Sequence, residues 1–156
     1  MSVQVGQQAP DFTLKNTDMT DVTLSSFRGQ KNVVLLFVPL AFSGVCTKEL
    51  CSVRDDLNAY SNLNAEVLGI SVDSPFAQKA WKEKENLNFT LLSDFNREVV
   101  KAYGAQYDRL MAFEGVAKRS AFVIDKAGNI QYAEVLESAG DLPNFDRINE
   151  ALQRLS

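Results

Sequence analysis

The sequence predicts an α/β domain with a mixed central sheet flanked by helices and an N-terminal β-hairpin. Two mainly apolar runs, Val33–Val38 and Glu66–Val72, are typical of strands that are covered on both faces. A helical pattern of apolar residues follows each run. Near the C-terminus, Ser120–Ile124 and Ile130–Leu136 flank a short connection that contains glycine, which predicts a hairpin. Alternating strands and helices, closed by an antiparallel pair, favour a mixed sheet.

Composition narrows the class of protein. With 156 residues, 46% of them hydrophobic and 23% charged, the chain is expected to form a single domain over residues 1–156. Its net charge of -4 predicts no nucleic-acid partner, and no apolar run approaches the roughly 20 residues of a membrane span. No secretory signal is visible, and two cysteines are too few for a secreted disulfide scaffold. We therefore expect a cytoplasmic enzyme or binding domain with no membrane partner.

The N-terminal third begins with two short segments that alternate apolar and polar residues. These segments, Phe12–Leu14 and Val22–Leu24, predict the N-terminal hairpin. The run Val33–Val38 is apolar at every position and predicts a central strand. That strand is expected to end at Pro39, because proline has no N–H to donate to a neighbouring strand.

A helix is predicted after Ser43, which is a favourable N-cap residue. The spacing of three and four residues defines one apolar face. This face consists of Leu50, Val53, Leu57 and Tyr60. Extended backwards, the same face includes Cys46 in the first turn, whereas Cys51 falls on a polar stripe of the helix.

The second half of the chain is predicted to add three helices and a short strand. They are a helix over Phe76–Lys84, a short strand or turn at Leu91–Asp94, a helix around Val99–Tyr103 that stops at Gly104, and a C-terminal helix over Phe145–Leu155. Residues 106–117 have weak periodicity, and no element is predicted there.

The sequence contains no histidine. This absence excludes Ser-His and Cys-His nucleophile pairs, and it excludes zinc sites that use histidine. Two cysteines alone cannot close a structural zinc site, so we expect neither a metal nor a cofactor. A reactive cysteine in this chain must be activated by a helix N-terminus, a neighbouring Arg or Lys, or backbone donors.

Cys46 has two interpretations. In the first turn of a helix, the unpaired N–H groups and the helix dipole stabilise a thiolate. Alternatively, Cys46 is a small core residue that continues the apolar face, as free cysteines usually do. Its position after the carboxyl end of a strand favours the first interpretation, because α/β sheets place functional sites there.

Cys51 is expected to be an accessible thiol, since it shares its stripe with polar residues. In an intact helix its Cα atom would lie roughly 8–9 Å from that of Cys46. A disulfide needs about 7 Å or less. A Cys46–Cys51 bond therefore requires the first helical turn to unwind, and the spacing is not that of a dithiol redox motif with two intervening residues.

The stretch from Pro39 to Cys46 resembles the peroxiredoxin signature, in which a proline is followed by Thr or Ser and then by cysteine. It is most similar to the bacterial E-type alkyl hydroperoxide reductases of the AhpC/TSA superfamily, and it also resembles the bacterioferritin-comigratory, or Q-type, branch. Further matching segments run along most of the chain. They are Gly6–Leu14, Glu49, Leu68–Val72, Leu91–Phe95 and Lys118–Asp125. The resemblance implies a thioredoxin-like fold and a thiol-dependent peroxidase.

The same resemblance implies roles for single residues. Cys46 would be the peroxidatic thiol, which becomes a sulfenic acid, and Arg119 the active-site arginine. Ser43 replaces the commoner threonine and keeps its hydroxyl donor. Pro39 would shield the pocket, and Glu49 would position the arginine. Without the resemblance, Ser43 is explained by a helix cap, Arg119 by a surface charge and Glu49 by the helix dipole.

The implied reaction reduces hydrogen peroxide and organic hydroperoxides. Cys51 matches the resolving position of many Q-type members, which implies an intramolecular disulfide that a thioredoxin or similar thiol reductant reopens. Two alternatives stay open: a one-cysteine peroxidase resolved by an external thiol, and a non-catalytic binding or chaperone module of the thioredoxin fold. The E-type resemblance implies a homodimer through the loops near Phe42 and Phe76, whereas the Q-type resemblance implies a monomer.

Overall fold

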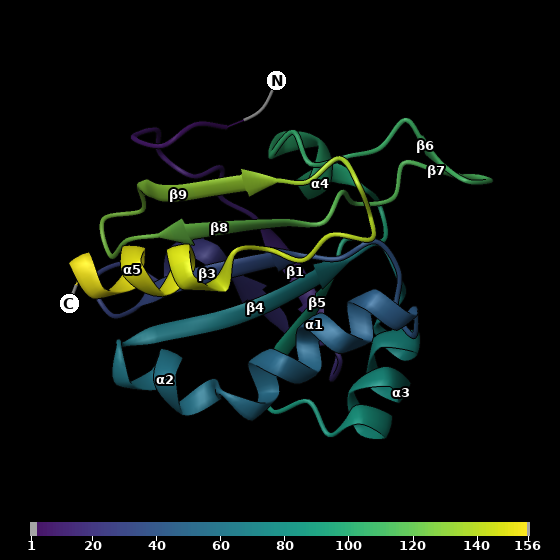
Figure 1. Cartoon of the computed structure of the whole chain (residues 1–156), viewed down its shortest axis with the longest axis horizontal. Coiled ribbons are helices and arrows are strands. Elements are labelled where there is room, and N and C mark those ends of the chain that lie inside the picture. Colours follow the sequence, from purple (N-terminus) through teal and green to yellow (C-terminus); the bar gives the residue numbers. More distant parts are fainter. Residues whose placement is uncertain (1–2, 156) are drawn as a thin grey trace.

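The computed structural model describes residues 3–155 and contains a seven-stranded sheet of order β2-β1-β5-β4-β3-β8-β9 (Figure 1). The strands of this sheet are β1 (Thr13–Asn16), β2 (Asp21–Thr23), β3 (Asn32–Phe37), β4 (Ala65–Ser71), β5 (Thr90–Ser93), β8 (Ser120–Ile124) and β9 (Ile130–Val135). The helices are η1 (Leu24–Phe27), α1 (Gly44–Asp55), α2 (Leu57–Asn62), α3 (Pro75–Glu85), α4 (Glu98–Ala102) and α5 (Phe145–Leu155).

The sheet is mixed, as predicted. β3 pairs with β4, and β4 pairs with β5, both in parallel. On its other side, β3 pairs with β8 in antiparallel orientation. Two antiparallel hairpins, β1–β2 and β8–β9, form the two ends of the sheet. Both predicted hairpins are therefore confirmed, and together with the parallel centre they give the thioredoxin-like arrangement.

β3 is buried at all six positions because it lies between two cores. Val33, Leu35 and Phe37 face the core that includes the α4 residues Val99 and Val100. The alternate residues face a second core, which is covered by α1, α2, α3 and α5. This alternation follows from the two-residue period of a strand and explains why no polar residue interrupts the run Val33–Val38.

The single helix predicted after Ser43 is wrong, because the chain forms two helices there. α1 ends at Asp55 and α2 begins at Leu57. Between them, Asp56 has φ -119° and ψ 20°, which is not a helical conformation. Val53 and Tyr60 nevertheless reach the same core, so the apolar spacing continues across the break and did not reveal it.

Residues 106–117, for which no element was predicted, form an arm that extends from the sheet at the right of Figure 1. Its tip is a two-stranded ribbon of β6 (Arg109–Leu110) and β7 (Phe113–Glu114). The turn residue Met111 adopts a left-handed φ of 56°. The two strands are short and largely exposed, so they carry no alternating apolar pattern that could predict them.

The direction of β8 decides where the functional residues meet. Because β8 runs antiparallel to β3, its first residue, Ser120, lies opposite Phe37, the last residue of β3. Arg119, which precedes β8, therefore lies at the same edge of the sheet as Pro39 and the start of α1.

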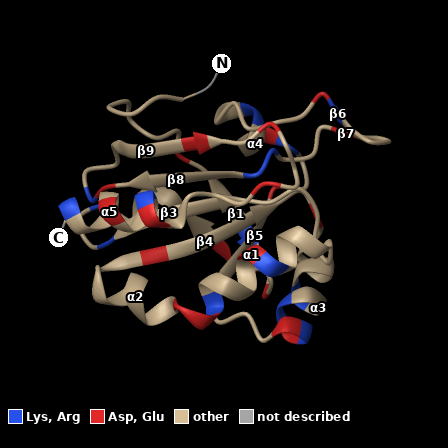
Figure 2. Ribbon diagram, viewed as in Figure 1, with Lys and Arg blue, Asp and Glu red and all other residues tan. Residues whose placement is uncertain are grey.

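None of the helices in residues 3–155 is long and apolar enough to cross a membrane. In the view of Figure 2, Lys and Arg residues are interspersed with Asp and Glu along α1, α3 and α5. The face seen there therefore presents both signs of charge on each of these helices.

Candidate active site

The N-terminus of α1 places Cys46 beside the carboxyl end of β3. Ser43 occupies the N-cap position with an extended backbone (φ -70°, ψ 151°), so Cys46 lies in the first helical turn, as expected. The Ser43 side chain does not cap the helix, however, since its hydroxyl donates to the Leu40 carbonyl oxygen at 2.8 Å. The first N–H groups of α1 are thus not taken up by Ser43 and stabilise negative charge beside Cys46.

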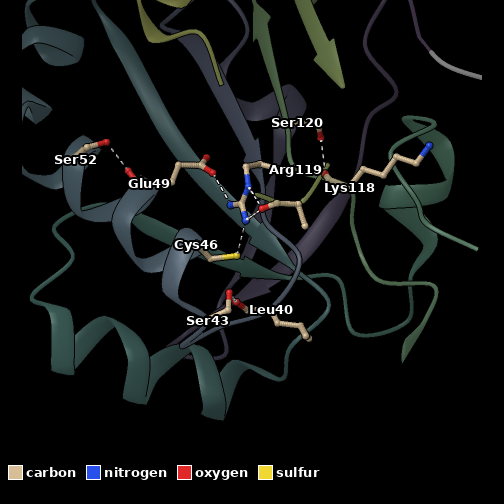
Figure 3. A network of polar contacts seen from close by, with 9 residues as sticks. Leu40, Ser43, Cys46, Glu49, Ser52, Lys118, Arg119 and Ser120 are labelled. Carbon is tan, nitrogen blue, oxygen red and sulfur yellow. Dashed lines mark hydrogen bonds and ion pairs between the residues drawn. The ribbon is translucent and has the colours of Figure 1, made fainter. Parts of the chain in front are cut away.

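Arg119, directly before β8, reaches two candidate side chains of α1, Cys46 and Glu49 (Figure 3). Its Nη2 donates to Cys46 Sγ at 3.3 Å, and its Nη1 donates to Glu49 Oε1 at 2.8 Å. Cys46 and Glu49 are three residues apart in one helix, so they lie on the same face and meet one planar guanidinium. All three residues are buried. The structure therefore brings Cys46, Arg119 and Glu49 into direct contact.

Ala139 holds the guanidinium from another side. Its carbonyl oxygen, in the loop between β9 and α5, accepts from Arg119 Nη2 at 2.9 Å and from Nε at 3.3 Å. Sequence reasoning missed this residue because its contribution is a main-chain atom, which no side-chain type signals. The loop fixes the plane of the guanidinium and thereby the direction of the N–H that points at Cys46.

Glu49 is the second buried ionisable group of the site. One carboxylate oxygen, Oε1, pairs with Arg119, whereas the other, Oε2, is buried without a hydrogen-bond partner. Burial raises the pKa of Glu49 from 4.5 to about 7; the hydrogen bond and charge of Arg119 oppose the shift, and the carboxylate of Glu134 adds to it. Glu49 therefore titrates close to neutral pH. When Glu49 is protonated, it no longer offers a negative charge to Arg119, and a thiolate at Cys46 is then the anion that the guanidinium contacts.

The charge of Arg119 itself is secured by its neighbours. Burial acts to lower its pKa, but Cys46 and Glu49 act in the opposite direction and the pKa of Arg119 is raised. The guanidinium stays positive in the interior, where electrostatic interactions are stronger than in water. A thiolate at Cys46 is stabilised there by a charge-assisted hydrogen bond as well as by the N-terminus of α1.

The Cys46 side chain is closed off in this structure, since its exposed fraction is 0%. Pro39, which directly follows Val38 at the end of the central strand, is also buried. Ser43 lies next to them and is half-buried. The Cys46 sulfur is therefore enclosed between the end of β3, the first turn of α1 and Arg119.

Cys51 does not join this cluster. It is half-buried and packs partly against the core beneath α1, so it is less accessible than its polar stripe predicted. Its Sγ donates to Glu85 Oε2 of α3 at 3.6 Å. Burial raises the pKa of the Cys51 thiol, and Glu85 contributes to the same shift. Both cysteines are free thiols.

Metal ions in proteins are bound mainly by groups of His, Cys, Asp and Glu side chains. No group of three or more His, Cys, Asp or Glu side chains in residues 3–155 has an arrangement that could hold a metal ion.

Comparisons with known proteins agree with this geometry. The model of the AhpC/TSA family matches residues 5–133. Alkyl hydroperoxide reductase E of Mycobacterium bovis is 42% identical over 156 residues, which is 99% of both chains. The chain belongs to the AhpC/TSA family. It is thus a peroxiredoxin, a thiol-dependent peroxidase of the oxidoreductase class.

Two solved peroxiredoxin structures show the same fold. The reduced 2-Cys peroxiredoxin of Plasmodium vivax is 32% identical and superposes with a TM-score of 0.86 over 97% of this chain and 81% of its own. The peroxidoxin BcpB of Mycobacterium tuberculosis is 29% identical, with a TM-score of 0.87 over 98% of both chains. The thioredoxin-like fold of the peroxiredoxin is therefore confirmed.

We expect Glu49→Gln to change how stability depends on pH. Because folding raises the pKa of Glu49 to about 7, the folded state binds this proton more tightly than the unfolded state. The contribution of this proton to the free energy of unfolding is fully present at pH values below the pKa of Glu49 in the unfolded state. It is lost as the pH rises through the pKa of Glu49 in the folded state. Gln cannot ionise, so the free energy of unfolding of the variant relative to wild type should increase by on the order of 3 kcal/mol between about pH 4.5 and about pH 7.5.

Urea unfolding at the two pH values measures this difference. Glu150→Gln, at an exposed position of α5, serves as the control with the same change of charge. A Glu49→Gln curve that runs parallel to wild type would show that Glu49 is ionised throughout.

Proposed function

We propose that this peroxiredoxin reduces hydrogen peroxide and organic hydroperoxides with Cys46 as the attacking thiol. The observation that carries the proposal is the contact between Arg119 Nη2 and Cys46 Sγ at 3.3 Å, beside the N-terminus of α1. A buried guanidinium and a helix N-terminus are the two features that make a cysteine reactive without histidine. The relative from Mycobacterium bovis is named for alkyl hydroperoxide reduction, which supports the class of substrate.

The chemical step follows from this arrangement. The Cys46 thiolate attacks one peroxide oxygen, the O–O bond breaks, and the products are a Cys46 sulfenic acid and an alcohol or water. Negative charge develops on the departing oxygen, which takes up the proton that Cys46 released on becoming a thiolate. The N–H groups of Arg119 would stabilise this charge. The Ser43 hydroxyl would exchange its present acceptor, the Leu40 carbonyl, for a peroxide oxygen. Pro39 would exclude water from the sulfur, and Glu49 would position Arg119.

Cys51 is the proposed resolving thiol. It lies in the same helix as Cys46, five residues further on, where an intact helix keeps the two sulfurs from bonding. The first turn of α1 must therefore unwind once Cys46 is a sulfenic acid. The burial of Cys46 supports such a movement, because an enclosed sulfur must leave its place to meet Cys51.

A thioredoxin or a similar dithiol protein is the proposed reductant of the Cys46–Cys51 bond. We place this cycle in the cytoplasm, where such reductants keep thiols reduced. Resolution of Cys46 by an external thiol, with Cys51 as a bystander, is the second candidate. The raised pKa of Cys51 favours this alternative, since a protonated thiol is a weaker nucleophile.

A homodimer is the proposed assembly. Three aromatic side chains, Phe42, Phe76 and Phe95, are exposed at the end of the sheet where the parallel strands end. Phe76 and Phe95 also line a hollow together with Met19. Exposed apolar surface of this kind marks protein–protein contacts, and in this arrangement a second copy would cover the loops beside Cys46.

The cysteine roles can be separated by mass spectrometry after one equivalent of peroxide. Wild type is expected to become lighter by two hydrogen atoms, because a disulfide forms. Cys51→Ser is expected to gain one oxygen as a sulfenic acid, and Cys46→Ser to consume no peroxide. Normal peroxide consumption by Cys46→Ser would refute the mechanism, and a stable sulfenic acid in wild type would favour resolution by an external thiol.

Arg119→Lys is expected to slow the oxidation of Cys46 by about 10²- to 10³-fold, since an ammonium cannot reproduce the planar set of contacts to Cys46, Glu49 and Ala139. Trp81 is the only tryptophan and donates to Thr47 next to Cys46, so stopped-flow fluorescence can follow the reaction. The control is Arg109→Lys in the exposed ribbon. A change of less than about threefold would mean that Arg119 does not stabilise the thiolate or the leaving oxygen.

Phe76→Glu is expected to weaken the dimer, because it places a charge in the proposed apolar contact. Sedimentation velocity over a range of concentrations should show dimers for wild type and mainly monomers for the variant. Leu142→Glu, at another exposed apolar position, is the control. A monomeric wild type would contradict the proposed assembly.

A further inference from the structure

Polar contacts tie α1 to α3 at matching intervals, and the two helices lie side by side in Figure 1. Trp81 Nε1 donates to Thr47 Oγ1 at 3.1 Å. One helical turn further along both helices, Cys51 Sγ donates to Glu85 Oε2 at 3.6 Å. We call the row of polar contacts that begins with these two, and that continues through Arg54 and Asn88, the α1–α3 seam.

The seam continues to the end of α1. Arg54 Nη1 donates to the main-chain oxygen of Glu85 at 2.5 Å, and Asn88 Nδ2 donates to the main-chain oxygen of Arg54 at 3.2 Å. The part of α1 from Thr47 onwards is thus bonded to α3 and to Asn88, which follows α3 in the chain. Before Thr47 the chain meets α3 through the ring of Phe42, whose centroid lies 6.3 Å from that of Trp81. Cys46 therefore precedes the seam, whereas Cys51 lies within it.

The surroundings of Cys51 keep its sulfur protonated. The charged groups that act on it are Glu85 from α3, and Arg54 and Asp55 from its own helix. Burial raises the pKa of Cys51; the hydrogen bond and charge of Glu85 and the charge of Asp55 raise it further, and Arg54 opposes them. A protonated Cys51 has an S–H to donate, and the carboxylate of Glu85 accepts it.

We propose that Glu85 sets the balance between the dithiol and the Cys46–Cys51 disulfide. Its carboxylate holds reduced Cys51 on α3 as a hydrogen-bonded thiol, which favours the dithiol, and Cys46 moves to this fixed sulfur when the first turn of α1 unwinds. This inference rests on the proposed role of Cys51 as the resolving thiol.

The chemistry makes the contact sensitive to oxidation state. In the resolving step the S–H bond of Cys51 and the S–O bond of the Cys46 sulfenic acid break, the S–S bond forms, and the thiol proton leaves with the hydroxyl oxygen as water. The sulfur of Cys51 is oxidised and that of the sulfenic acid is reduced. A disulfide sulfur has no hydrogen to donate, so the bond to Glu85 exists only in the dithiol form. Glu85 therefore stabilises the dithiol and makes the disulfide easier to reduce.

Glu85→Gln tests the contact, with Glu83→Gln as the matched control at an exposed position of the same helix. The first measurement is the pH profile of Cys51 alkylation by iodoacetamide, made in the Cys46→Ser background. Removing the carboxylate should move the midpoint to lower pH, because a negative acceptor no longer favours the protonated thiol. The control should leave the profile in place.

The second measurement is the equilibrium of the Cys46–Cys51 disulfide with a dithiothreitol redox buffer. Glu85→Gln should raise the equilibrium constant for disulfide formation roughly three- to tenfold, since the charge-assisted bond that stabilises the dithiol is weakened. Hydrogen exchange of the wild-type disulfide form should show lost protection at Thr47–Leu50 and retained protection at Trp81–Glu85.

Three results would overturn the proposal. They are an alkylation profile of Glu85→Gln that matches the control, an unchanged disulfide equilibrium, and loss of protection in α3 when the disulfide forms. If wild type forms no Cys46–Cys51 disulfide, the proposed resolving role of Cys51 is wrong. The alkylation profile still decides in that case whether Glu85 controls the Cys51 thiol, so the two failures can be told apart.

Discussion

The buried guanidinium of Arg119 is the interaction on which the site depends. It donates to Cys46, to Glu49 and to the Ala139 carbonyl, all at the edge of the sheet where β3 ends. A buried charge is costly unless partners compensate it, and removing one partner leaves the others unpaired. β8, α1 and the loop before α5 must therefore be packed together before the contacts of Arg119 form, and the candidate site is part of the core.

α1 meets two opposing demands in the proposed cycle. Its intact first turn places N–H groups beside Cys46, which stabilises the thiolate. The same turn must unwind if Cys46 is to reach Cys51. The α1–α3 seam divides the helix between these tasks, because it begins at Thr47 and leaves the first turn outside. A local change at the N-terminus of α1 can then proceed while the rest of the helix stays on the sheet.

Much of the fold could be predicted because it depends on local patterns. The apolar run Val33–Val38, the alternating hairpins and the amphipathic helices each carry a period that the chain alone displays. The break at Asp56 was missed because the apolar spacing continues through it, and the ribbon β6–β7 was missed because it buries little. For the site, Arg119 and Glu49 came from the resemblance to peroxiredoxins, and Ala139 had no signal because it acts through its backbone.

The sequence by itself determined that a strand feeds a helix with Cys46 in its first turn, and that histidine takes no part in the chemistry. These are properties of neighbouring residues and of composition. Only the tertiary structure decided which cation meets Cys46, since 73 residues separate it from Arg119. The antiparallel pairing of β8 with β3 brings them together, and the burial that results gives Glu49 its titration near neutral pH. Contacts of this length are set by how strands pair, which no local period encodes.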